Sequence, residues 1–158
     1  MKLKGKVAIV TGASSDRGSA IAELLASEGA SVTINYLKSK KNALSVLKRI
    51  ENSDGKAMTL QADVTSKASV NKMIKETVKK FGRIDILVNN AHSTIKRKSF
   101  EGTKWNEYEE DLNGIIKGAY NCSQAVIGEM KKNKCGRIIN IMDNIVNDPV
   151  KGYGSYMT

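Results

Sequence analysis

The chain of 158 residues carries a formal net charge of +10, with 41% hydrophobic and 27% charged residues. This length predicts one domain with a sizeable core, and this composition excludes disordered, collagenous and fibrous chains. The apolar run after the basic start, at residues 7–10, is too short for a signal peptide, and no run approaches the roughly 18 apolar residues of a membrane helix. The only cysteines, Cys122 and Cys135, lack a metal-binding spacing, so we expect a reducing cytoplasm and no metal site.

The positive charge lies mainly in the first half of the chain. Residues 1–90 hold 16 Lys or Arg against 8 Asp or Glu, whereas residues 91–158 hold 10 against 8. A basic surface can attract an acidic ligand or carrier, anionic lipid or nucleic acid. These lysines interleave with apolar positions at helical spacing rather than with aromatic residues, so we expect them on the outer faces of helices. Nucleic acid is therefore the least favoured partner.

Short apolar runs alternate with segments of helical periodicity along the whole chain. The runs predict strands over residues 6–11, 31–36, 56–62, 84–89 and 136–142. The first predicted helix has Ala20, Ile21, Leu24 and Leu25 on one stripe, and the last is a long helix over residues 103–131. Strands separated by helices imply right-handed crossovers, so the sequence predicts an α/β fold. Its parallel sheet is doubly wound and Rossmann-like, with strand order 3-2-1-4-5.

The first predicted strand ends in a turn at residues 11–18, which reads Thr-Gly-Ala-Ser-Ser-Asp-Arg-Gly. Ligands of open parallel sheets bind where the winding reverses, and this first turn can place backbone amides around a pyrophosphate. The turn does not match the dinucleotide-binding motif G-x-G-x-x-G. Taken alone, it can also be interpreted as an ordinary loop. Further motifs follow it in order: Asp63-Val64, Asn89-Asn90-Ala91, Asn113 and Tyr156.

In the order and spacing of these motifs, the chain resembles the short-chain dehydrogenase/reductase family from about Gly5 to its last residue. Residues 140–156 are most similar to bacterial members akin to 3-oxoacyl-carrier-protein reductases. The resemblance implies a nicotinamide-dependent oxidoreductase that passes hydride to a carbonyl compound, acyl-carrier substrates included, or from an alcohol. It implies that residues 11–18 form the turn under the cofactor phosphates and that Asp63 and Val64 lie against the adenine. It also implies that residues 89–91 support the sheet near the nicotinamide. The implied cofactor-binding residues are Thr11, Gly12, Ser14, Ser15, Asp16, Arg17, Gly18, Tyr36, Lys38, Asp63, Val64, Asn89, Asn90 and Ala91.

The resemblance also implies the catalytic residues. Tyr156 would be the acid/base, Asn113 would hold a water in the proton relay, and Asp143 stands at the position of the family's serine. An ionised carboxylate accepts hydrogen bonds but cannot donate one to a developing oxyanion. The family's Lys, four residues after the Tyr, is not in this sequence, which ends at Thr158. We therefore expect a C-terminally truncated domain over residues 1–158 with impaired activity, and the alternative is a noncatalytic nucleotide-binding or interaction remnant.

Two more positions depart from the family's pattern. Asp16 replaces a glycine, so its side chain is expected to crowd and repel the phosphates and to weaken nucleotide binding. His92 replaces the glycine after Asn-Asn-Ala and is interpreted as a loop residue rather than a catalyst or metal ligand.

The segment after the second strand bears on the choice of cofactor. Residues 35–41 read Asn-Tyr-Leu-Lys-Ser-Lys-Lys and lack the carboxylate that binds an NAD ribose, so NADP is favoured over NAD. In relatives the long helix 103–131 builds an oligomer interface, so a homo-oligomer is expected; the alternative is that its apolar residues are core.

Overall fold

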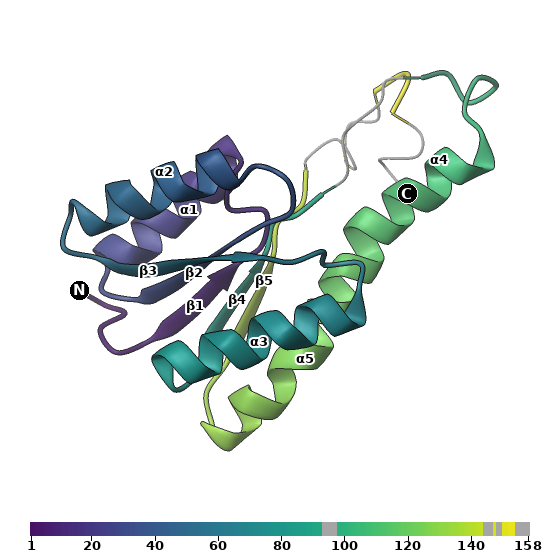
Figure 1. Ribbon diagram of the computed structural model, residues 1–158. Helices are drawn as coiled ribbons and strands as arrows, with labels where there is room; N and C mark the ends of the chain where they lie inside the picture. The colour runs from purple at the N-terminus through teal and green to yellow at the C-terminus, as the bar shows by residue number, and fades with distance from the viewer. Residues whose placement is uncertain (93–97, 144–146, 148–149, 154–158) are drawn as a thin grey trace.

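The computed structural model describes residues 1–92, 98–143, 147 and 150–153. Five parallel strands form one sheet in the order β3-β2-β1-β4-β5 (Figure 1). The strands are β1 (Val7–Val10), β2 (Ser31–Tyr36), β3 (Lys56–Gln61), β4 (Ile86–Asn89) and β5 (Arg137–Asn140). The predicted doubly wound α/β fold and its strand order are confirmed.

Helices cover both faces of this sheet (Figure 1). They are α1 (Asp16–Ser27), α2 (Lys40–Glu51), α3 (Lys67–Phe81), α4 (Trp105–Leu112), the π-helix η1 (Asn113–Lys117) and α5 (Gly118–Lys132). In β1, Ala8 and Val10 belong to the buried cluster under α1 and α2, whereas Ile9 belongs to the one under α3 and α5. Because successive side chains of a strand point to opposite faces, an entirely apolar strand serves two cores.

The helix termini follow local signals in the sequence. Ser15 and Ser66 cap α1 and α3 by accepting hydrogen bonds from the amides of Gly18 and Ser69. Gly82 ends α3 with φ +83°, the left-handed conformation that favours glycine. The expected apolar stripe of α1 is wrong at Ala20 and Leu24, which are both exposed, Leu24 to 65%. The helix turns Gly18, Ala22 and Ala26 inward instead.

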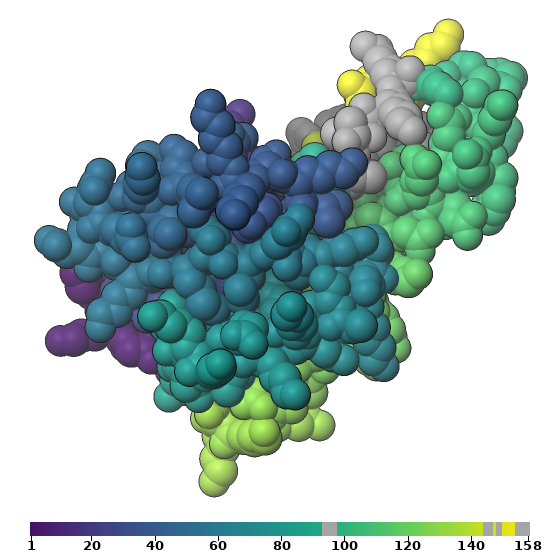
Figure 2. All heavy atoms as spheres, viewed as in Figure 1, coloured from purple at the N-terminus to yellow at the C-terminus, as the bar shows by residue number. Residues whose placement is uncertain are grey.

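The long helix predicted over residues 103–131 is divided in the structure. A π-helical turn over Asn113–Lys117 separates α4 from α5. A Cβ at Gly118 would lie 2.7 Å from Cγ2 of Val64, so the chain comes unusually close to the loop after β3 at this point. Hydrophobic periodicity does not reveal an i to i+5 turn, and π-helical turns often accompany functional sites. The segment that includes α4 projects from the rest of the molecule (Figure 2).

Strand β5 lies at the edge of the sheet, and all four of its residues are exposed. Ile138 and Ile139, which face opposite sides of the strand, are 38% and 45% exposed. Among the helices that the structure describes, none is long and apolar enough to cross a membrane.

Candidate functional site

A cavity of about 600 Å³ opens at the carboxyl ends of the strands. It extends from the turn between β1 and α1 to the loops after β2, β3 and β4, and reaches α4 and η1. Its lining residues are Gly12, Ser14, Ser15, Asn35, Leu37, Lys38, Ser39, Ala62, Asp63, Val64, Thr65, Asn90, Ala91, His92, Glu110 and Gly114. The volume is that of a small-molecule site, and its place is the reversal point of the doubly wound sheet.

The turn between β1 and α1 is held by close backbone packing. Gly12 has φ +61°, and a Cβ there would lie 3.0 Å from Cα of Ala91. A Cβ at Gly18 would lie 2.5 Å from the carbonyl oxygen of Gly12. The Ser15 hydroxyl donates to that same carbonyl and accepts from the Gly18 amide. The two glycines therefore let the turn approach both α1 and the chain after β4.

Three backbone amides around the start of α1 indicate a binding site for an anionic ligand. The amides of Gly12 and Ala13 are bonded to Asn35, through its side chain and its carbonyl respectively. In the described part of the chain, the amides of Ser14, Asp16 and Arg17 have no acceptor. Helix N-termini attract anions through such amides and the helix dipole, so this turn fits a pyrophosphate.

The chain after β4 is fastened to β1 by two polar side chains. Thr11 is buried, and its hydroxyl accepts from the amides of Asn90 and Ala91 at 2.9 and 3.0 Å and donates to the Val88 carbonyl. The Asn90 amide group donates to the carbonyls of Thr11 and Gly12 and accepts from Nε of Arg17 at 2.9 Å. These hydrogen bonds therefore fix the position of the cavity wall on this side.

The opposite wall is the loop after β3. The Asp63 carboxylate accepts from the amide and the hydroxyl of Thr65, both at 2.8 Å, and its own amide donates to the Ser69 hydroxyl. Asn121 of α5 donates to the carbonyls of Val64 and Thr65. These bonds give the loop a fixed shape, so it forms a preformed recess beside the glycine turn.

The structure brings together most of the predicted cofactor-binding residues. The cavity lining includes the predicted residues Gly12, Ser14, Ser15, Lys38, Asp63, Val64, Asn90 and Ala91. The others lie around it: Thr11, Gly18, Tyr36 and Asn89 are buried behind the wall, while Asp16 and Arg17 are exposed on α1.

The predicted catalytic residues are not assembled in the described part of the chain. Asn113 is half-buried at the start of η1, next to the lining residue Gly114. Asp143 is half-buried three residues after β5, outside the cavity lining. Tyr156 lies outside the described residues. Tyr153, three residues earlier in the sequence, forms a parallel bridge with Lys98, which places Tyr153 beside the segment before α4.

Several lining residues were missed by the sequence analysis. Asn35 and Ser39 flank the carboxyl end of β2, and the rule that ligands bind at such ends could have found them. Glu110 and Gly114 come from α4 and η1, whose approach to the sheet depends on the π-helical turn. No signal in the sequence predicted that approach.

Asn89 supports the floor of the site near the carboxyl end of β4. Its side-chain amide donates to Oδ1 of Asn140 at 2.8 Å and to the hydroxyl of Ser123 at 3.2 Å. The side-chain oxygen of Asn89 is buried and has no hydrogen-bond partner among the residues that the structure describes. An orphaned acceptor of this kind fits a bound water or a ligand donor.

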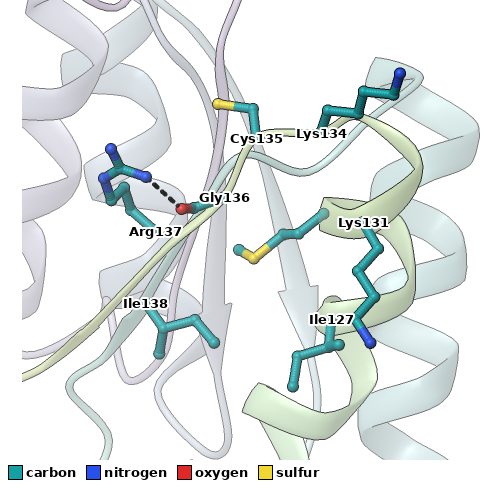
Figure 3. A pocket seen from close by; sticks show the side chains of 8 residues that line it. Ile127, Lys131, Lys134, Cys135, Gly136, Arg137 and Ile138 are labelled. Atoms are coloured by element: carbon teal, nitrogen blue, oxygen red, sulfur yellow. Dashed lines mark hydrogen bonds between the residues drawn. The ribbon is translucent and has the colours of Figure 1, made fainter.

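A second cavity, of about 650 Å³, lies at the other end of β5 (Figure 3). It is lined by Ile127, Met130, Lys131, Lys134, Cys135, Gly136, Arg137 and Ile138, and the Arg137 guanidinium donates to the Gly136 carbonyl at 2.8 Å. The nearest helix end is the C-terminus of α5, which carries negative rather than positive partial charge. This cavity therefore lacks the amide donors of the first.

Cys122 and His92 are two described side chains of reactive type that the predicted catalytic set does not include. Burial raises the pKa of the Cys122 thiol to about 12, so it is not a nucleophile near neutral pH. His92 is exposed at the cavity rim. No group of three or more potential metal ligands occurs among the residues that the structure describes.

The sequence and the structure were both compared with known proteins. The sequence profile of the short chain dehydrogenase family matches residues 6–158. A 3-oxoacyl-(acyl-carrier-protein) reductase of Staphylococcus epidermidis is 40% identical over 136 residues, which are 86% of this chain and 55% of the relative. An uncharacterised oxidoreductase of Methylorubrum extorquens is 37% identical over 147 residues, 93% of this chain and 58% of the relative.

Solved structures agree with this relationship. A short-chain dehydrogenase/reductase of Serratia marcescens, solved as a mutant, superposes with a TM-score of 0.91 at 32% identity over 99% of this chain and 63% of that one. A 7α-hydroxysteroid dehydrogenase in complex with NADH and 7-oxo glycochenodeoxycholic acid gives 0.92 at 30% identity, over 99% and 60%. The chain thus spans between 55% and 63% of the length of these relatives. With a family profile that matches almost all of its length, the chain belongs to the short chain dehydrogenase family.

Proposed function

We propose that residues 1–158 form a single dinucleotide-binding domain of an oxidoreductase that interconverts a carbonyl and an alcohol. The observation that carries this proposal is the cavity at the reversal point of the sheet. On one side it has backbone amides, around the start of α1, that have no acceptor among the described residues, and on the other the hydrogen-bonded Asp63 loop. The bound nicotinamide would supply or accept the hydride. The names of the reductase and hydroxysteroid dehydrogenase relatives support this reaction class.

Within this proposal the chain's own residues have separate tasks. The amides of Ser14, Asp16 and Arg17 bind the phosphates, and the loop at Asp63 and Val64 packs against the adenine. Asn90 and Ala91, through their hydrogen bonds to Thr11, fix the segment after β4 on the nicotinamide side. Asn113 takes part in the proton relay.

Tyr156 is proposed as the group that gives a proton to the carbonyl oxygen or takes one in reverse. A phenol can do so because it donates one hydrogen bond and accepts others. Asp143 stands where a donor to the same oxygen is expected. A carboxylate there opposes the negative charge that develops on the oxygen. This chain is therefore proposed to bind the cofactor but to catalyse hydride transfer slowly.

NADP is the proposed cofactor. Lys38 lines the cavity at the end of β2, and Ser39 lies beside it ahead of α2. A 2′-phosphate is favoured by such a cation and by a helix N-terminus, whereas a carboxylate at this place would favour the 2′-hydroxyl of NAD. The described lining has no carboxylate between Asn35 and Ser39.

Titration with both cofactors tests this function. Trp105 is the only tryptophan, so quenching of its fluorescence, with calorimetry as a second method, can follow NADPH and NADH binding to the 158-residue chain. We expect NADPH to bind about tenfold more tightly than NADH, and Lys38→Ala to remove most of the difference. The matched control is Lys72→Ala on α3, away from the cavity. Tighter binding of NADH, or no binding of either, would contradict the proposal.

We also propose that the chain forms homo-oligomers through the helix from η1 to α5. Ile116, Tyr120 and Ile127 lie on one side of this helix and are 54%, 58% and 41% exposed. Light scattering of the wild-type chain and of a Tyr120→Glu, Ile127→Glu double variant tests this directly. We expect the variant to be monomeric, and a monomeric wild-type chain would refute the proposal.

A further inference from the structure

Asn35 is a buried residue that is not among the predicted cofactor-binding residues. It occupies the next-to-last position of β2, is 2% exposed, and lies between the glycine turn and the loop after β3. A buried amide group costs free energy unless both its donor and its acceptor are bonded, so its partners have to be accounted for.

The two ends of this amide group bond to different walls of the cavity. Its Oδ1 accepts from the Gly12 amide at 3.1 Å, in the glycine turn. Its Nδ2 donates to the Ala62 carbonyl at 3.0 Å, immediately before Asp63, and to the Leu60 carbonyl at 3.4 Å. The backbone carbonyl of Asn35 also accepts from the Ala13 amide at 2.8 Å. One residue of β2 therefore joins the phosphate side to the adenine side.

The chemistry of this junction requires a carboxamide. The Gly12 amide needs an acceptor and the Ala62 carbonyl needs a donor, and asparagine provides both within one short, planar group. An aliphatic side chain would leave both groups unpaired. A carboxylate would place its negative charge against the carbonyls of Leu60 and Ala62.

We infer that Asn35 is a positioning residue that fixes the distance between the phosphate-binding turn and the adenine-side loop. The inference rests on the proposed dinucleotide function. Because Asn35 occupies the Gly12 amide, it also directs the phosphates to the amides of Ser14, Asp16 and Arg17. Loss of the carboxamide should weaken ligands that touch both walls and spare those that touch neither.

Thr33 provides a matched control on the same strand. It lies two residues earlier on the same face of β2 and is fully buried, and its hydroxyl is hydrogen-bonded to that of Thr77 at 3.1 Å. It is outside the cavity lining. Thr33→Ala thus removes a buried hydrogen bond of β2 without touching either wall.

The experiment compares wild type, Asn35→Ala and Thr33→Ala as full 158-residue chains. Urea unfolding of the free chains measures stability, and amide hydrogen exchange measures the protection of Gly12. Calorimetry then measures the dissociation constants of NADPH, adenosine 2′,5′-bisphosphate and reduced nicotinamide mononucleotide.

We expect Asn35→Ala to weaken NADPH and adenosine 2′,5′-bisphosphate about tenfold, to leave the mononucleotide nearly unchanged, and to speed exchange at Gly12. Thr33→Ala should lower stability while its ligand affinities and Gly12 exchange stay near those of wild type. If Asn35→Ala does not fold, Asn35→Ser, whose hydroxyl satisfies one of the two groups, carries the same expectation.

Two results overturn the inference. One is unchanged NADPH affinity in the Asn35 variants; the other is an equal loss of affinity in Thr33→Ala, which would mean that affinity only follows stability. Both leave the proposed function standing, because the wild-type chain binds NADPH in each case. A wild-type chain that binds no dinucleotide refutes the proposed function, and the inference with it.

Discussion

The backbone amide of Val7 donates to Oδ2 of Asp85 at 3.0 Å, across 78 residues of sequence. This bond joins the start of β1 to the segment before β4, at the end of the sheet opposite the proposed site. The Asp85 side chain is 1% exposed; it accepts from Nε of Arg83 at 2.8 Å and lies 3.5 Å from Nζ of Lys6. The buried carboxylate is thus surrounded by donors and positive charge.

These contacts make stability depend on pH. Burial alone would raise the pKa of Asp85, but the hydrogen bonds from Arg83 and Val7 and the charges of Arg83 and Lys6 lower this pKa below its ordinary value. A carboxyl whose pKa is lower in the folded than in the unfolded state stabilises the fold above the unfolded pKa. This stabilisation is lost as pH falls through the folded-state pKa.

We predict that Asp85→Asn lowers the free energy of unfolding at pH 7 by about 1–3 kcal/mol. The difference from wild type should begin to shrink below about pH 4, where the carboxyl of the unfolded chain becomes protonated, and should disappear as the pH falls through the lower pKa of the folded state. Urea unfolding across this pH range measures both effects. The control is Glu129→Gln, which removes the more exposed ion pair to Lys132 and should cost less than about 1 kcal/mol. A constant difference between Asp85→Asn and wild type at all pH values would contradict the assignment.

The sequence predicted those parts of the molecule whose signals are local. Strand β2 was predicted with its observed bounds, and the strand order followed from the alternation of strands and helices. The π-helical turn at Asn113 was missed because hydrophobic periodicity does not reveal it; directly after it Gly118 lies close to Val64, a contact between distant parts of the sequence. The hydrogen bonds of Asn35 were also not predictable, since its partners Gly12 and Ala62 lie 23 and 27 residues away.

Two glycines give contrasting predictions. A Cβ at Gly18 would lie 2.5 Å from the Gly12 carbonyl oxygen and 2.7 Å from the side-chain nitrogen of Asn90, whereas a Cβ at Gly128 on α5 meets nothing within 4 Å. We predict that Gly18→Ala costs about 1–3 kcal/mol of stability and weakens NADPH, because the turn has to shift. Gly128→Ala should raise stability by up to about 1 kcal/mol, since alanine favours a helix. Thermal unfolding and NADPH titration measure both, and a neutral Gly18→Ala would show that the turn is looser than its contacts indicate.

Asp16 is expected to act in opposite directions on stability and on binding. It is exposed in the first turn of α1, where a negative charge stabilises the helix by about 0.3–1 kcal/mol. The same charge lies beside the amides proposed to bind phosphate. We predict that Asp16→Gly lowers stability slightly and tightens NADPH about tenfold, more at low than at high salt.

Asp54→Gly is the control for Asp16→Gly. It removes the same charge from the turn after α2, where φ is +57° and glycine is well tolerated. Its NADPH affinity should equal that of wild type. If both variants tighten NADPH equally, the effect belongs to net charge rather than to the position of Asp16.

At the position of Asp143 a hydroxyl would donate a hydrogen bond to the carbonyl oxygen of the substrate, and removal of one such donor typically costs about 100-fold to 1,000-fold in rate. An ionised carboxylate adds repulsion of the negative charge that develops there. We therefore expect the 158-residue chain to bind NADPH without oxidising it in the presence of simple ketones or 3-oxoacyl thioesters. Absorbance at the reduced-nicotinamide band follows turnover, and calorimetry confirms that cofactor is bound in the same samples.

Two variants locate the cause of this expected inactivity. Asp143→Ser should leave the NADPH dissociation constant unchanged, because Asp143 lies outside the cavity lining, so any change that it brings belongs to the chemical step. Tyr156→Phe shows whether trace oxidation depends on the phenol. Rapid NADPH oxidation by the unmodified chain that disappears in Tyr156→Phe would mean that a carboxylate at position 143 is compatible with catalysis. The role proposed for Asp143 would then be wrong, whereas that of Tyr156 would stand.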